Sequence, residues 1–179
     1  MTTETKTPKL NTLEYLPYLN ESGIIPEVLQ KKIGVYAIFD QEQKLQFVGY
    51  SRDIYASLKQ HLVRQPHNCY WLKVEIITRP SRTILEEIKK SWLSENGELS
   101  LNSEENKRLW TQPIDAKTSM TEEEKETYKN SDELTQIKLL KKISRRVQGD
   151  IEDTLKHRGN QMEIRFNPKL KEQGLLDLK

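Results

Sequence analysis

The chain has 179 residues, of which 35% are hydrophobic and 31% are charged, so it is long enough for one folded domain with an additional segment. This composition excludes a fully disordered protein, because such proteins have too few apolar residues to bury. With 29 Lys and Arg against 27 Asp and Glu, the net charge of +2 excludes the strong global field of a general nucleic-acid or membrane binder. Any basic binding site must therefore be local.

The cysteine content and the hydropathy of the chain both bear on its location. Cys69 has no second cysteine to pair with, which excludes an intramolecular disulfide and favours a reducing compartment. The first residues are polar, and no apolar run approaches the ~18 residues that a membrane-spanning helix needs. We therefore expect a soluble, cytoplasmic protein without a transmembrane segment.

The first part of the chain predicts a lead-in segment and a β-hairpin. Residues 1–32 are interrupted by prolines and a glycine, which leave room for short helical turns wrapped on a domain. Two runs rich in β-branched and aromatic residues follow, Gly34–Asp40 and Leu45–Tyr50. The short polar stretch between them predicts an antiparallel pair of strands.

A helix, a third strand and a second helix are predicted next. Asp53 can cap a helix in which apolar residues recur at every fourth position. The stretch Cys69–Thr78 has the composition of a strand, and Ser81 begins a helix that ends near Asn96. This order predicts an α/β (α+β) domain over residues 33–97, with a small three-stranded sheet flanked by helices.

The remaining residues predict a linker and a mostly helical extension. Residues 98–120 show no hydrophobic period, so we expect a linker or surface loop there. In the extension, residues 121–179, apolar spacing predicts a helix over 121–149 and a second one over 150–157. The alternation in Met162–Phe166 predicts a short strand after them.

The most specific pattern in the chain lies in the predicted hairpin. Gly34-Val35-Tyr36 is part of its first strand and Phe47-Val48-Gly49 is part of its second, and the following helix reaches His61. This pattern resembles the GIY-YIG nuclease family over about residues 33–97. Within the family it is most similar to the domain that precedes a monothiol glutaredoxin in plant plastids and to its free-standing cyanobacterial relatives. The resemblance implies a GIY-YIG-type fold and a plastid or cyanobacterial cytoplasmic setting.

The resemblance also implies a chemical role for two residues. Tyr36 matches the tyrosine that activates or orients the attacking water, and Glu86 matches the glutamate that binds Mg²⁺ or Mn²⁺. A second alignment of the same helix puts Lys89 in the place of the glutamate, which removes the metal ligand. If the site is active, the resemblance implies weak, metal-dependent cleavage of DNA with Tyr36 and Glu86 as the catalytic residues.

Two positions depart from the family pattern. Phe47 stands in place of the second tyrosine and has no hydroxyl, and Ser57 stands in place of the arginine. Loss of a positioned transition-state donor typically lowers a rate by ~10²–10³, and Arg52 and Arg64 lie outside that position. The pattern therefore favours a catalytically degenerate binding module that needs no cofactor, with a weak endonuclease as the alternative.

Other polar residues near the motif have structural interpretations as well. Without the arginine, Tyr36 is more simply interpreted as a packing residue whose hydroxyl has a hydrogen-bond partner. Ser57 and His61 are four residues apart and could meet on one helix face, yet the pattern supplies no third group to orient them. A solvated helix face is the favoured interpretation of that pair.

The predicted extension contains a local basic patch. Five cations fall on one side of its first helix at helical spacing: Lys138, Lys141, Lys142, Arg145 and Arg146. The patch could bind a protein partner, nucleic acid or an anionic membrane surface. It could also be an ordinary solvated face, because residues 121–179 contain 13 basic and 12 acidic side chains. Aromatic residues for stacking on bases are absent from it. We expect an unidentified protein partner, and the sequence has no signal for the oligomeric state.

Overall fold

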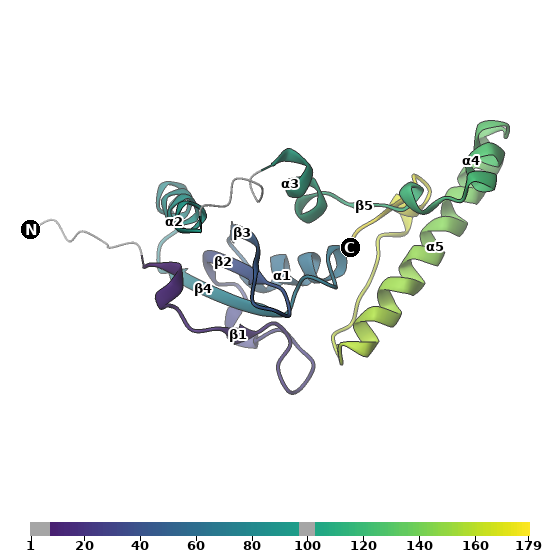
Figure 1. The fold of residues 1–179 in the computed structure, drawn as a ribbon. Helices are drawn as coiled ribbons and strands as arrows, with labels where there is room; N and C mark the ends of the chain where they lie inside the picture. The colour runs from purple at the N-terminus through teal and green to yellow at the C-terminus, as the bar shows by residue number, and fades with distance from the viewer. Residues whose placement is uncertain (1–7, 97–102) are drawn as a thin grey trace, which may run out of the picture. The chain divides into compact units, whose positions relative to one another are not determined.

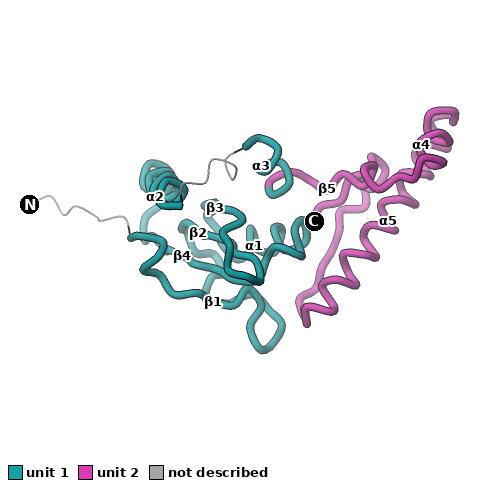
Figure 2. Tube along the Cα trace, viewed as in Figure 1, with its two compact units in different colours: residues 1–110 teal, residues 111–179 magenta. Residues whose placement is uncertain are grey.

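The structure is a computed structural model, and it describes residues 8–96 and 103–179. Parts of the predicted lead-in and linker fall in residues 1–7 and 97–102, which lie outside the described residues. The chain divides into a first unit, residues 1–110, and a second unit, residues 111–179 (Figure 2). Among the described residues, no helix combines the length and apolar character needed to span a membrane.

The first unit contains an antiparallel sheet with the strand order β1-β4-β2-β3 (Figure 1). β2 (Ile33–Phe39) and β3 (Leu45–Ser51) form the predicted hairpin, and β4 (Trp71–Ile77) pairs with the other side of β2. These three strands are confirmed. A fourth strand, β1 (Leu16–Pro17), pairs with the start of β4 and was not predicted, because two residues are too few to show an alternating pattern.

Helical segments connect and flank these strands. The lead-in forms two short 3-10 helices, η1 (Leu10–Thr12) and η2 (Glu27–Leu29). Three α-helices follow: α1 (Ile54–Arg64), α2 (Arg82–Glu95) and α3 (Glu104–Thr111). The predicted caps are confirmed, because the side chains of Asp53 and Ser81 accept hydrogen bonds from backbone amides in the first turns of α1 and α2. These bonds satisfy donors that would otherwise be left without partners at the helix ends.

Helix α3 forms where the sequence predicts a linker or surface loop. In this eight-residue helix the buried side chain is that of Trp110. A helix that buries one side chain produces no apolar repeat, so its pattern could not be distinguished from that of a loop. The two helices predicted to flank the sheet, α1 and α2, each bury several apolar residues, and the resulting apolar repeat made them recognisable in the sequence.

Helices α1 and α2 pack on opposite faces of the sheet. Side chains alternate between the two faces along a strand. The α2 face consists of a cluster that includes Val35, Ala37, Phe39, Val48, Leu85, Ile88 and Trp92. Tyr36 and Ile38 alternate with these β2 residues and face α1 instead. Because Tyr36 pairs with Gly49 and Ile38 pairs with Phe47, Tyr36 and Phe47 share the α1 face, whereas the motif valines, Val35 and Val48, face α2.

The two motif glycines occupy positions where a side chain has no room. A Cβ atom on Gly34 would lie 2.2 Å from the backbone carbonyl oxygen of Glu75 on β4. A Cβ atom on Gly49 would lie 2.8 Å from the hydroxyl oxygen of Tyr36. Both distances are below those that nonbonded atoms adopt in folded proteins. Packing of the hairpin is therefore a sufficient reason for glycine at both positions.

The second unit is mostly helical, as predicted. It contains a two-stranded pair, a 3-10 helix and three α-helices: β5 (Ile114–Asp115), β6 (Leu175–Leu176), η4 (Ala116–Ser119), α4 (Glu122–Lys129), α5 (Glu133–His157) and α6 (Pro168–Lys171). Leu140, Ile143 and Leu155 are buried on one side of α5, and Leu176 of β6 is fully buried. The predicted strand at Met162–Phe166 is wrong, because Phe166 forms an isolated bridge to Leu178 and no ladder.

The predicted helix boundaries in this unit are also wrong. The chain leaves the helix at Asn130, and the Asp132 side chain then caps α5 by accepting from the amide of Thr135. The helix predicted over 121–149 is therefore two helices. Gly149 does not end α5, because helical hydrogen bonding continues through it to His157. Packing of Ile151 and Leu155 beyond the glycine offsets its low helix propensity.

Alanine substitutions at Gly34 and Gly149 test this assignment of roles. Gly34→Ala should lower the free energy of unfolding by about 1–3 kcal/mol, because β2 and β4 must separate to admit the methyl group. Gly149→Ala should raise it by about 0.5–1 kcal/mol, because the same methyl group meets no atom within 4 Å and alanine favours a helix. Urea denaturation followed by circular dichroism measures both. Equal effects of the two substitutions would contradict the packing role of Gly34.

Candidate functional site

Tyr36, the residue expected to act on water, is buried on β2 with 3% of its surface exposed. Its hydroxyl oxygen lies 2.7 Å from Nε2 of His61 on α1. Burial raises the pKa of Tyr36 well above its ordinary value, and the smaller opposing effects of Ser57 and Arg64 do not cancel this shift. The phenol therefore keeps its proton at neutral pH and is a hydrogen-bond donor.

His61 has a defined protonation state because both of its ring nitrogens have partners. Nδ1 lies 2.9 Å from the backbone carbonyl oxygen of Trp110, which can only accept, so Nδ1 holds the ring proton. Nε2 is then the acceptor for the Tyr36 hydroxyl. Burial, with a smaller contribution from the charge of Arg64, lowers the pKa of His61 to about 3. The imidazole is therefore neutral and links β2 to α3.

Helix α3 packs Trp110 on Phe47 and His61, the two rings that contact Tyr36. The Trp110 indole stacks on Phe47 with 5.2 Å between ring centroids and an interplanar angle of 11°. Nη1 of Arg64 donates to the same Trp110 carbonyl oxygen at 2.8 Å that accepts from His61. Phe47 thus supplies an apolar surface for Trp110 where a tyrosine was expected from the resemblance. Tyr36 itself is buried beside the rings of Phe47 and His61.

Ser57 and His61 have different surroundings from those predicted. The Ser57 hydroxyl donates to Oγ of Ser51 at 2.7 Å, which joins the start of α1 to the end of β3. The solvated face predicted for the pair is wrong for His61, which is 4% exposed. The misassignment arose because a neutral histidine enclosed by aromatic rings looks polar in the sequence. Arg64, which was expected to lie away from the motif, is brought beside His61 through their shared acceptor.

Glu86, the expected metal ligand, does not lie with Tyr36. It is on α2, and its Oε1 accepts a hydrogen bond of 2.5 Å from the hydroxyl of Tyr50. Tyr50 follows Gly49 on β3 and therefore points to the α2 face of the sheet, away from Tyr36. The candidate catalytic residues are thus separated by the sheet itself.

The surroundings of Glu86 do not resemble a metal site. Arg82 Nε lies 4.0 Å from its Oε1, and Lys89 places its Nζ 5.8 Å from the ring centroid of Tyr50. Across the described ranges 8–96 and 103–179, no three His, Cys, Asp or Glu side chains are grouped so that they could hold a metal ion. A divalent cation needs several oxygen ligands, and the residues present here do not fit Mg²⁺ or Mn²⁺.

The basic patch of the second unit divides into two groups. Arg146 donates from both terminal nitrogens to the Glu124 carboxylate at 2.9 and 3.0 Å, and this contact lowers the pKa of Glu124 to about 2. Lys141 Nζ lies 3.4 Å from Oε1 of Glu172. These two cations stabilise contacts within the unit. The other three, Lys138, Lys142 and Arg145, have exposed side chains with no ion pair among the described residues.

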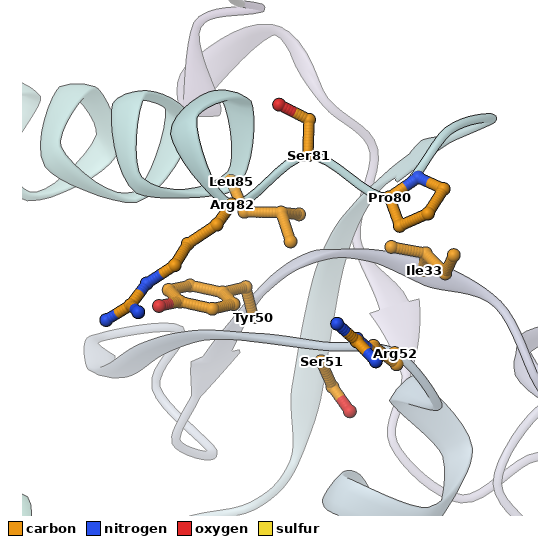
Figure 3. Close-up of a pocket in the computed structure, with 8 residues that line it drawn as sticks. All are labelled: Ile33, Tyr50, Ser51, Arg52, Pro80, Ser81, Arg82 and Leu85. Carbon is orange, nitrogen blue, oxygen red and sulfur yellow. The ribbon is translucent and has the colours of Figure 1, made fainter.

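A cavity of about 420 Å³ lies on the α2 face, at the end of the sheet (Figure 3). Its wall consists of Ile33, residues 50–52 at and just after the end of β3, and residues 80–82 with Leu85 at the start of α2. Two arginines, Arg52 and Arg82, line it. These residues come from three separate segments, so no local sequence pattern could have identified the cavity.

Comparison with known proteins supports part of the resemblance. The chain matches no family model. It is 39% identical over 87 residues to a protein of Arabidopsis thaliana described as bifunctional monothiol glutaredoxin-S16, chloroplastic. The aligned region is 49% of this chain and 28% of that relative, so the chain spans less than a third of the relative's length. The expected relationship to a plastid monothiol glutaredoxin is confirmed for this region.

Acid should destabilise the first unit through His61. The unfolded chain takes up a proton near pH 6.5, whereas the folded imidazole does so near pH 3, so stability is complete above pH 6.5 and falls as the pH decreases. The loss is about 1.4 kcal/mol per pH unit, or about 2 kcal/mol between pH 6.5 and 5. Urea denaturation followed by tryptophan fluorescence measures it, since Trp71, Trp92 and Trp110 all lie in this unit.

The matched control for this prediction is His61→Gln. It should be less stable than the wild-type chain at pH 7, because the hydrogen bonds to Tyr36 and Trp110 are disturbed, yet its stability should be nearly constant between pH 6.5 and 5. The low pKa of Glu124 affects stability only below about pH 4.5, outside this window. A wild-type profile as flat as that of the variant would contradict the buried neutral state of His61.

Proposed function

We propose that the first unit is a GIY-YIG-type domain that no longer cleaves phosphodiesters and acts as a binding module. The observation on which this proposal rests is the state of Tyr36, whose hydroxyl donates to His61 and which is 3% exposed beside the Phe47 and His61 rings that pack against Trp110. A general base must reach the water that it activates and must be able to accept a proton. A buried phenol that keeps its proton and already donates a hydrogen bond to an imidazole does neither.

The substitutions at the motif support the same proposal. Phe47 stacks on Trp110, and Ser57 bonds to Ser51, so neither residue faces a substrate. Glu86 lies on the opposite face of the sheet from Tyr36. Tyr36, Gly34 and the other retained motif residues all have packing or hydrogen-bonding roles in the fold. Retention of the motif therefore does not require retention of the chemistry.

A weak metal-dependent endonuclease is the second candidate. The observation in its favour is that Arg64 lies beside His61 and Tyr36, where a guanidinium could stabilise phosphate charge. In the structure that guanidinium donates to the Trp110 carbonyl oxygen. Cleavage would require α3 to leave the site and a metal ion to be held by residues other than Glu86. This candidate therefore needs two changes that the binding module does not.

We assign partner docking to an exposed stripe of α5, formed by Lys138, Lys142 and Arg145. These residues are spaced by four and three positions and therefore lie on one face of the helix. Leu134, one turn before Lys138, extends the stripe and is 63% exposed. A mixed apolar and cationic surface is complementary to an acidic protein surface that contains apolar residues. Nucleic acid fits less well, because α5 has no aromatic residue on which bases could stack.

The chain should not cleave plasmid or branched DNA in Mg²⁺ or Mn²⁺. Tyr36→Phe and Glu86→Ala should leave this result unchanged, because neither side chain faces a substrate. Gel electrophoresis of the reaction products measures cleavage. Cleavage by the wild-type chain that both substitutions abolish would overturn the binding-module proposal in favour of the endonuclease.

Charge reversal on the α5 stripe should abolish partner capture. In a pull-down from native extract, the variant Lys138→Glu, Lys142→Glu, Arg145→Glu should lose an acidic protein that the wild-type chain retains. Capture by the wild-type chain should weaken steeply between 0.1 and 0.5 M salt, roughly as expected for contacts between exposed charges. Circular dichroism should show that the variant keeps its helices, because all three side chains are exposed.

The matched control changes the same net charge elsewhere in the second unit. Lys129→Glu, Lys169→Glu, Lys179→Glu alters three exposed lysines that lie outside the stripe. This control should capture the partner as the wild-type chain does. Loss of capture in both triple variants would indicate a dependence on net charge alone, and capture of DNA instead of protein would contradict the assignment of the partner.

A further inference from the structure

The cavity on the α2 face differs from the motif site in position and in chemistry. It is bounded by Ile33 at the start of β2, Tyr50 and Arg52 at the end of β3, and Arg82 and Leu85 in α2. Figure 3 shows the Tyr50 ring between the guanidinium groups of Arg52 and Arg82, with Leu85 beside the ring and Ile33 near Pro80 and Arg52. Its volume of about 420 Å³ is within the range of sites for small molecules.

The charged groups around the cavity are mainly cationic. Arg52 is exposed, and its guanidinium makes no hydrogen bond or ion pair with any part of the chain that the structure describes. Arg82 shares the carboxylate of Glu86 with the hydroxyl of Tyr50, and Lys89 lies over the Tyr50 ring. Three cations are therefore opposed by one carboxylate. This excess matches an anion with close to two negative charges.

Polar and apolar parts of the wall occupy different positions. The hydroxyls of Ser51 and Ser81 point away from the cavity in Figure 3, and they bond to Ser57 and to the backbone of Ile84. Ile33, Leu85 and the Tyr50 ring are left as the apolar surface inside it. A ligand must therefore combine an anionic group for the arginines with an apolar body for this surface.

We propose that this cavity binds a small phosphomonoester with an aromatic or apolar ester group. A phosphomonoester carries a charge of about −1.5 to −2 at pH 7, and planar guanidinium groups bind its oxygens in pairs. A carboxylate carries one charge and would leave the cationic excess unmatched. Binding here uses the sheet face opposite Tyr36, so it does not depend on whether the motif site is catalytic or on the partner of α5.

Phenyl phosphate is a suitable probe, with phenol and inorganic phosphate as its two halves. Titration of the full-length chain, followed by ¹H–¹⁵N NMR, should show binding of phenyl phosphate at least about tenfold tighter than that of either half. The largest changes should occur at the amides of Ile33, Arg52 and Arg82. Equal binding of phenyl phosphate and phenol would overturn the anion site, and equal binding of phenyl phosphate and inorganic phosphate would overturn the apolar part of the proposal.

Substitutions of single arginines test the placement of the ligand. Arg52→Gln and Arg82→Gln should each weaken phenyl phosphate binding about tenfold, because each removes charged hydrogen bonds to the phosphate. Arg79→Gln is the matched control, since Arg79 is exposed on the same connection before α2 and does not line the cavity. It should bind as the wild-type chain does. Equal weakening by all three substitutions would indicate general surface attraction and would overturn the proposal.

Discussion

The buried hydrogen bond from the Tyr36 hydroxyl to His61 is the interaction on which the arrangement of the first unit depends. It joins β2 to α1, and the second nitrogen of His61 joins α1 to the Trp110 carbonyl of α3. Buried polar groups are costly when any member of a network loses its partner, so these three elements constrain one another. Tyr36, to which the resemblance assigns a catalytic role, is used here to hold the fold together. The binding functions that we propose therefore use other surfaces.

Local sequence signals were sufficient for much of the fold. The hairpin, the third strand and the caps at Asp53 and Ser81 were predicted because each has a pattern within a few residues. Helix α3 was missed because Trp110 is its buried residue, and Gly149 was taken as a helix end because its packing context is nonlocal. Elements were thus predictable where they bury a repeating set of side chains and were missed where one distant contact decides the structure.

The candidate site was less predictable than the fold. The resemblance identified Tyr36, His61 and Glu86, yet the sequence could not show that α2 covers the sheet face opposite Tyr36. The position of Arg64 depends on the Trp110 carbonyl, which is 46 residues away in the chain. The arginine-lined cavity is assembled from segments that are distant in sequence. The ion pairs of Lys141 and Arg146 are formed with Glu172 and Glu124, which both lie outside α5. Each of these features is a tertiary contact without a local pattern.

The most direct measurement of the central claim is the protonation state of His61 itself. Long-range ¹H–¹⁵N NMR distinguishes the two neutral tautomers and the charged form, and comparison with His61→Gln assigns the signals among the three histidines of the chain. The account predicts a neutral ring with its proton on Nδ1 that does not titrate between pH 8 and 5. A ring that titrates near pH 6.5, or one with its proton on Nε2, would contradict the buried hydrogen bond from Tyr36 and leave that hydroxyl available for chemistry.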